Sequence, residues 1–193
     1  MAARGYAGSS MSTLADEAGI PKSAIYHHFG SKAGLLAAVM ERGAREFFDA
    51  MTEAHRNPPS DGTSRERLEW YFQRTGDVWV HRAEFLRLLI LLVISDEAEE
   101  APEAMETVVR VRTEGRAYLE HMIRSSFIGE GDDVARIVGR ELSFYAMVGF
   151  DGLFVSLQSH DGKPVVELID QMVAGLVAIG EARSRELRTA PPA

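Results

Sequence analysis

Two short helical patterns joined at a single glycine, within residues 9–32, constrain the fold more than any other feature of this chain. The first pattern places apolar side chains at spacings of three and four, at Met11, Leu14, Ala15 and Ala18. This spacing predicts a helix over residues 10–18 with one apolar face. Ser9 and Ser10 stand at its start, where their hydroxyls can accept hydrogen bonds from the free N–H groups of the first turn.

The chain is predicted to reverse direction at Gly19, because a residue without Cβ enters the left-handed region at little cost. Ile20 is expected to be an apolar plug beneath both helices. Pro21 favours the start of a second helix, where its missing N–H costs nothing. In that helix Ile25 and Phe29 are expected to face inward.

The outward face of the second helix carries polar and aromatic side chains: Lys22, Ser23, Tyr26, His27 and His28. A surface rich in hydrogen-bond donors and aromatic rings suits a DNA groove. Two short helices around one tight turn, with such a face on the second, predict a helix-turn-helix.

A dense run of residues here resembles the signature of the tetracycline-repressor (TetR) family: Ala15, Ala18, Gly19, Ile20, Ile25, Tyr26, His28, Phe29, Ser31 and Lys32. The resemblance implies an all-α, dimeric transcription regulator, usually a repressor. It implies a helix-turn-helix DNA-binding domain over residues 1–45 and a larger helical ligand-binding and dimerisation domain over residues 46–190. Its partners would be a pseudo-palindromic double-stranded operator and a small inducer that releases it.

Positions that match the family's DNA-contacting residues are carried over one by one. Those expected at phosphates, where contacts position the protein without specifying a sequence, are Ser9, Ser10 and Lys32. Those expected at base edges in the major groove are Lys22, Ser23, Ala24 and His27, and those nearer the backbone are Tyr26 and His28. Lys22 is the strongest candidate for reading a base, with a preference for the acceptors of guanine.

The resemblance also implies a whole helix before the Gly5–Tyr6 pair, whereas only four residues precede Gly5. We expect that the start codon was assigned too far downstream; a true truncation is the alternative. A two-helix motif without this brace would bury too little apolar area to offset the entropy of ordering it.

Composition is that of a globular protein, with 193 residues of which 46% are hydrophobic and 26% charged. The absence of cysteine excludes disulfides and thiolate chemistry and fits a cytoplasmic protein. No segment resembles a signal peptide, and the longest apolar run, residues 85–94, is too short to cross a bilayer.

The net charge of −8 argues at first against a nucleic-acid partner. Within residues 1–40, however, Arg4, Lys22 and Lys32 outnumber Asp16 and Glu17, so the acidic excess lies in the rest of the chain. A mildly basic tip would orient the protein toward phosphate. So few basic side chains predict modest affinity for each subunit and a need for dimerisation.

The chain beyond the motif is predicted to be helical throughout, with no strand. Helices are expected over about residues 32–55, 64–80, 84–95 and 102–127, with a loop at residues 57–63. Residues 142–157 are apolar nearly all round, which requires cover on more than one side. The last two helices, about residues 134–158 and 164–188, are therefore expected to form a homodimer interface; a buried core helix in a monomer is the alternative.

Aromatic, methionine and histidine side chains on the middle and later helices are candidates for an inducer pocket: Tyr71, Phe72, Trp79, His81, Phe85, Tyr118, His121, Met122, Phe144, Met147 and Phe150. As a set they suggest a cavity for an apolar or aromatic molecule, with His81, Tyr118 and His121 as polar anchors. Each of them taken alone is more often a plain core residue than a ligand contact. The histidine spacing predicts no metal site, and no cofactor is expected.

If both sites exist, ligand binding would bias the long helix at residues 32–55 and lower the affinity for the operator. The main alternative is a helical dimeric small-molecule-binding module that has lost DNA binding. An enzyme is a distant third, because no catalytic triad order, phosphate loop or metal set stands out.

Overall fold

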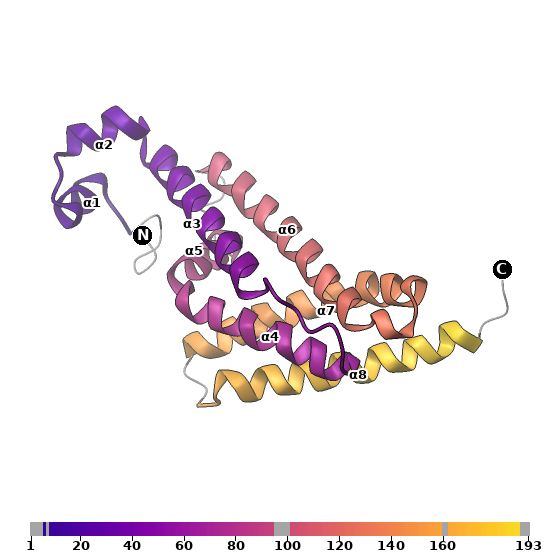
Figure 1. The fold of residues 1–193 in the computed structure, drawn as a ribbon. Coiled ribbons are helices and arrows are strands. Elements are labelled where there is room, and N and C mark those ends of the chain that lie inside the picture. The colour runs from indigo at the N-terminus through magenta and orange to yellow at the C-terminus, as the bar shows by residue number, and fades with distance from the viewer. Residues whose placement is uncertain (1–5, 7, 95–100, 160–161, 190–193) are drawn as a thin grey trace. The chain divides into compact units, whose positions relative to one another are not determined.

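Every regular element that the structure describes is helical. The structure is a computed structural model, and it describes residues 6, 8–94, 101–159 and 162–189. The elements are α1 (Met11–Ala18), α2 (Lys22–Phe29), α3 (Lys32–Ala54), α4 (Ser64–His81), α5 (Ala83–Ile94), α6 (Pro102–Ser126), the 3₁₀ turn η2 (Ile128–Glu130), α7 (Asp132–Ser159) and α8 (Val165–Thr189) (Figure 1). The predicted all-α class is confirmed, and in this part of the chain no helix is long and apolar enough to span a membrane.

The turn between α1 and α2 forms as the residue types predict. Ser10 caps α1, since its Oγ accepts a hydrogen bond from the backbone N–H of Thr13 at 3.0 Å. Gly19 has φ +66°, in the left-handed region that a Cβ disfavours. The backbone N–H of Ile20 then donates to the carbonyl of Ala15 at 3.1 Å, which closes the end of α1.

Contacts divide the chain into two compact units, neither of which is continuous in sequence. The first unit comprises residues 1–50 and 80–112, and the second comprises residues 51–79 and 113–193. Helices α3, α4 and α6 therefore contribute residues to both. The domain boundary expected after residue 45 falls inside α3 and stays a prediction.

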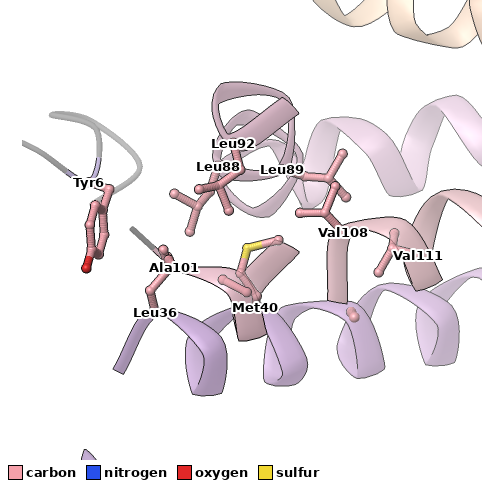
Figure 2. Packing of buried hydrophobic residues seen from close by; sticks show 11 residues of the cluster. Tyr6, Leu36, Met40, Leu88, Leu89, Leu92, Ala101, Val108 and Val111 are labelled. Atoms are coloured by element: carbon pink, nitrogen blue, oxygen red, sulfur yellow. The ribbon is translucent and has the colours of Figure 1, made fainter. Parts of the chain in front are cut away.

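The core of the first unit joins α3 to α5 and the start of α6. Leu36 and Met40 of α3 are fully buried against Leu88 and Leu92 of α5 and Val108 of α6 (Figure 2). The ring of Tyr6 also belongs to this cluster. The helix-turn-helix has only a small core of its own, built on Met11, Ala15 and Ile25.

The second unit is built around the antiparallel pair α7 and α8 (Figure 1). Phe127, which is fully buried, packs against Gly180 of α8 so closely that a Cβ there would collide with its ring. Arg183 of α8 forms a two-pronged ion pair with Glu141 of α7, at 2.9 and 3.1 Å. These contacts fix the register of the two helices.

Candidate nucleic-acid interface and ligand site

Helix α2 presents the polar face predicted for it. Lys22, Ser23, Tyr26, His27 and His28 are all exposed, whereas Ile25 is buried and Ala24 is half-buried. The inward side of α2 therefore rests on one large apolar residue. The outward side offers an ammonium, a hydroxyl, a phenol and two imidazoles to a partner.

Lys22, at the first position of α2, is held by α1. Its Nζ donates a hydrogen bond to Oγ of Ser12 at 3.0 Å. The same Nζ lies 5.8 Å from the centre of the Tyr26 ring, at the outer limit of a cation–π contact. Ser12, which lies on α1, was missed in the sequence because nothing in its own position distinguishes it from the neighbouring serines.

The three residues expected at phosphates differ in their surroundings. Ser10 is exposed, and its hydroxyl is engaged in the cap of α1. Lys32 is half-buried, with Nζ 4.0 Å from the centre of the Tyr6 ring. Ser9 is only 2% exposed, so its expected phosphate contact does not fit its burial; its place just before the cap residue turns it toward the protein.

An open apolar groove of about 550 Å³ runs along the first unit. It is lined by Leu14, Ala18, Ile20, Ile25, Phe29, Leu35, Val39, Arg42, Gly43, Glu46, Glu84, Phe85 and Leu88. Ile20 and Phe29 were expected to be buried, and this was wrong: they are 45% and 37% exposed. Both form the wall of the groove, where nothing in the described chain covers them.

Several of the expected ligand residues gather around His55 in the second unit. The Nδ1 atom of His55 lies 3.2 Å from the hydroxyl of Tyr118, and Nε2 lies 3.0 Å from the backbone carbonyl of Tyr71. Because a carbonyl can only accept, Nε2 carries the proton of the neutral ring. The Tyr118 hydroxyl has one hydrogen, which Nδ1 and the backbone carbonyl of Met51, 3.3 Å away, can both accept. Thr75 completes the cluster: its hydroxyl donates to the Tyr71 carbonyl at 2.9 Å, and the sulfur of the buried Met122 lies 3.7 Å from the same oxygen.

The pKa of His55 is lowered, mainly because the imidazole is buried. The hydrogen bond to the Tyr71 carbonyl raises this pKa, whereas the nearby Arg74 and His121 lower it further. The imidazole is therefore neutral near pH 7. Burial raises the pKa of the Tyr71 and Tyr118 hydroxyls, so both remain protonated donors. The result is a neutral, hydrogen-bonded polar centre inside an apolar unit.

The other expected ligand residues are not brought to this centre. Trp79 stacks near Phe150, with ring centres 5.0 Å apart, and Phe72 lies 5.1 Å from Phe150 on another side. Met147 lies beside Gly115 of α6. Phe144 is 63% exposed on α7.

His81 and Phe85 belong to the first unit, whereas the rest of the set belongs to the second. Phe85 packs against Phe47, with ring centres 5.9 Å apart. Within the part of the chain that the structure describes, no three His, Asp or Glu side chains are grouped so as to hold a metal ion.

A second apolar surface lies on α7 and α8. Its most exposed members on α7 are Phe144, Tyr145, Val148 and Val155, each more than half exposed. A shallow groove of about 490 Å³ crosses this surface at Gly149 and Gly152. Gly149 lets Met172 of α8 approach closely, while a Cβ at Gly152 would meet nothing. The described chain leaves these apolar side chains of α7 exposed, as at a surface for a partner.

The segment that forms the helix-turn-helix is also the one that matches a family model. Residues 1–39 match the model described as "Bacterial regulatory proteins, tetR family". The chain is 27% identical over 110 residues to the HTH-type transcriptional repressor NemR of Escherichia coli K12, covering 55% of this chain and 54% of NemR. It is 31% identical over 86 residues to the HTH-type transcriptional activator FasR of Mycolicibacterium smegmatis, covering 45% of this chain and 38% of FasR.

The matched segment thus spans about half the length of NemR and less of FasR. The fold extends the likeness to the whole chain. It is similar to the TetR family transcriptional regulator PfmR of Thermus thermophilus, with a TM-score of 0.59 and 17% identity over 95% of this chain and 91% of that one. Residues 1–39 thus match the tetR family of bacterial regulatory proteins, and the fold of the whole chain is similar to that of a solved TetR family regulator.

Proposed function

We propose that this protein is a cytoplasmic transcription regulator that binds a pseudo-palindromic operator with α2 in the major groove. The observation that carries the proposal is the face of α2, where Lys22, Ser23, Tyr26, His27 and His28 are all exposed beside a single buried anchor, Ile25. Such a face offers hydrogen-bond donors and aromatic edges to a partner. Similarity of this chain to the repressor NemR and the activator FasR supports DNA binding.

Two copies acting together fit the apolar face of α7 and α8. So few basic side chains surround α2 that one subunit would gain only modest affinity from phosphates. A symmetric pair would present two α2 helices to successive major grooves, about 34 Å apart, and so double the contacts. Burying Phe144, Tyr145 and Val148 between the copies supplies the free energy for pairing.

We further propose that a small apolar or aromatic molecule controls DNA binding from the second unit. Support comes from the neutral centre at His55, where Tyr71, Tyr118 and Met122 meet. A ligand that displaces the Tyr118 hydroxyl from His55 would find both an apolar wall and a hydrogen-bonding partner. Ligand binding would lower the affinity for the operator only if the ligand binds the DNA-free state more tightly than the DNA-bound state, as expected for a repressor.

The test is a mobility shift with DNA that flanks the gene for this protein, at two salt concentrations. The polypeptide of 193 residues and a version extended upstream in frame are compared. Specific binding that weakens steeply with salt supports the proposal. Binding by the extended version alone would mean that DNA recognition needs residues beyond this sequence, while binding by neither would refute the proposal.

The second candidate is a dimeric small-molecule-binding module without DNA recognition. It is favoured by the open groove of the first unit and by the small core of the helix-turn-helix. Failure of both versions to bind DNA, with ligand binding retained, would establish it. An enzyme has no comparable support, since the family is one of regulators.

A further inference from the structure

The hydrogen bond between Lys22 and Ser12 joins the two helices of the motif at the surface proposed to read DNA. Nζ of Lys22 on α2 donates to Oγ of Ser12 on α1 at 3.0 Å, across ten residues of sequence. Both side chains are exposed. A lysine ammonium at an exposed position is normally free to move on four rotatable bonds, so this contact restricts it before any partner arrives.

The hydrogen-bonding capacity of the pair decides what it can recognise. An ammonium has three N–H donors and no acceptor, and Ser12 uses one of them. Two donors remain, and the Ser12 hydroxyl that accepts from Lys22 keeps its own hydrogen to donate. The ring of Tyr26, whose centre is 5.8 Å from Nζ, limits the directions in which the ammonium can turn. The pair is therefore a fixed cluster of donors.

A cluster of donors matches one base edge better than the others. In the major groove guanine offers two adjacent acceptors, N7 and O6, whereas adenine offers one acceptor beside a donor and cytosine offers a donor. Phosphate oxygens also accept but carry no sequence information. Fixing the ammonium reduces the entropy lost on binding and sharpens the difference between guanine and the other bases.

On the basis of the proposed function, we propose that Ser12 is a positioning residue, which holds Lys22 as a two-donor reader of one guanine in each operator half-site. Ser12 acts through Lys22 and needs no DNA contact of its own. Removing its hydroxyl leaves the charge in place but frees the ammonium. The variant is then expected to prefer guanine less strongly at one base pair of each half-site. Its preferences at the other base pairs are expected to change little.

The experiment is a double-mutant cycle on duplexes selected by the wild-type protein from random DNA. Each guanine of the selected site is replaced in turn by 7-deazaguanine, which removes the N7 acceptor. For wild type we expect about a tenfold loss of affinity at one guanine in each half-site, the scale of a good base contact. In Lys22→Met we expect 7-deazaguanine to cause no loss of affinity at that position, and in Ser12→Ala a loss of only about twofold. The double variant is expected to behave like Lys22→Met. Ser12→Thr keeps the hydroxyl, so this variant is expected to show the full effect of 7-deazaguanine, about tenfold, as the wild-type protein does.

Each contrary result has a distinct meaning. Unchanged discrimination in Ser12→Ala would overturn the positioning role while leaving DNA binding intact. Additive effects of the two substitutions would show that Ser12 contacts DNA on its own, which also overturns it. A uniform loss in Lys22→Met with a shallower salt dependence would assign Lys22 to phosphate. If neither the 193-residue protein nor the version extended upstream selects a site, the proposed function itself fails. Far-ultraviolet circular dichroism and thermal unfolding of each variant keep misfolding apart from these outcomes.

Discussion

His55 shows how a single side chain links the stability of the second unit to pH. Its ring is 8% exposed and is held by Tyr118 and the carbonyl of Tyr71. Burial lowers the pKa of His55 in the folded protein below the ordinary value of 6.5, which applies to the unfolded chain. At a pH between these two pKa values, His55 binds a proton only in the unfolded chain. Stability therefore rises with pH through this window and is fully present above about pH 6.5.

We expect the free energy of unfolding of the wild-type protein to fall between about pH 7.5 and about pH 5.5. The slope is at most about 1.4 kcal/mol for each pH unit from this one group. Urea unfolding at both pH values measures it. His55→Gln is expected to be less stable at the higher pH but to lose part of the pH dependence. His28→Gln, at an exposed histidine of the first unit, is the control; an equal loss of pH dependence in this control would contradict the assignment to His55.

Residue types predicted some roles and missed others for a physical reason. The exposed face of α2 follows from local periodicity, so Lys22 and its neighbours could be identified from the sequence. The importance of His55 depends on Tyr71 and Tyr118, which lie 16 and 63 residues further along the chain. No local pattern records contacts over such separations. Ser12 was missed for the same reason, because its partner lies on the next helix.

At the scale of the helices, the close contact between Gly180 of α8 and Phe127 predicts how sensitive the packing of α8 is to one added methyl group. A Cβ at residue 180 would collide with the Phe127 ring, which is fully buried, so that ring or α8 would have to shift. We expect Gly180→Ala to lower the free energy of unfolding by about 1–3 kcal/mol, the usual cost of overpacking. Thermal and urea unfolding measure this loss.

Gly115→Ala in α6 is the matched control, since a Cβ there would lie 3.6 Å from the end of Met147, an ordinary contact. Alanine favours a helix over glycine, so this variant is expected to gain about 0.5–1 kcal/mol. A neutral Gly180→Ala would show that α8 can move away from Phe127, and would contradict the close packing described for these elements.

Helix positions were predictable because periodicity, caps and glycine turns are local. The expected helix over residues 32–55 is α3 (Lys32–Ala54), and that over residues 64–80 is α4 (Ser64–His81). Which apolar side chains of these helices and turns are buried, and which are exposed, was less predictable. Ile20 and Phe29 are as apolar as core residues, yet they line an open groove, and hydrophobicity alone does not tell which apolar face finds a cover.

At the scale of the whole molecule, the proposed pairing through α7 and α8 predicts that one charge on this face separates the copies. Val148 is 53% exposed beside Tyr145 and the groove at Gly149. We expect Val148→Lys to be a monomer by sedimentation velocity at concentrations where the wild-type protein is a dimer, because a buried lysine without a partner is costly.

The control for this experiment is Val80→Lys, at a valine of similar exposure outside α7 and α8. It is expected to sediment like the wild-type protein. Val148→Lys is also expected to bind the operator more weakly, since each monomer holds only one half-site. A dimeric Val148→Lys with unchanged DNA binding would place the contact between copies elsewhere.

The interleaving of the two units along the chain sets the order in which the protein can mature during translation. Leu36 and Met40 are covered by Leu88, Leu92 and Val108, which are synthesised only after residues 51–79 of the other unit. At about 5–20 residues per second, the apolar face of α3 waits a few seconds on the ribosome for its cover. A nascent or prematurely terminated product that ends before residue 88 lacks the side chains of α5 and α6 that cover Leu36 and Met40, so the apolar face of α3 stays exposed to solvent and to other chains.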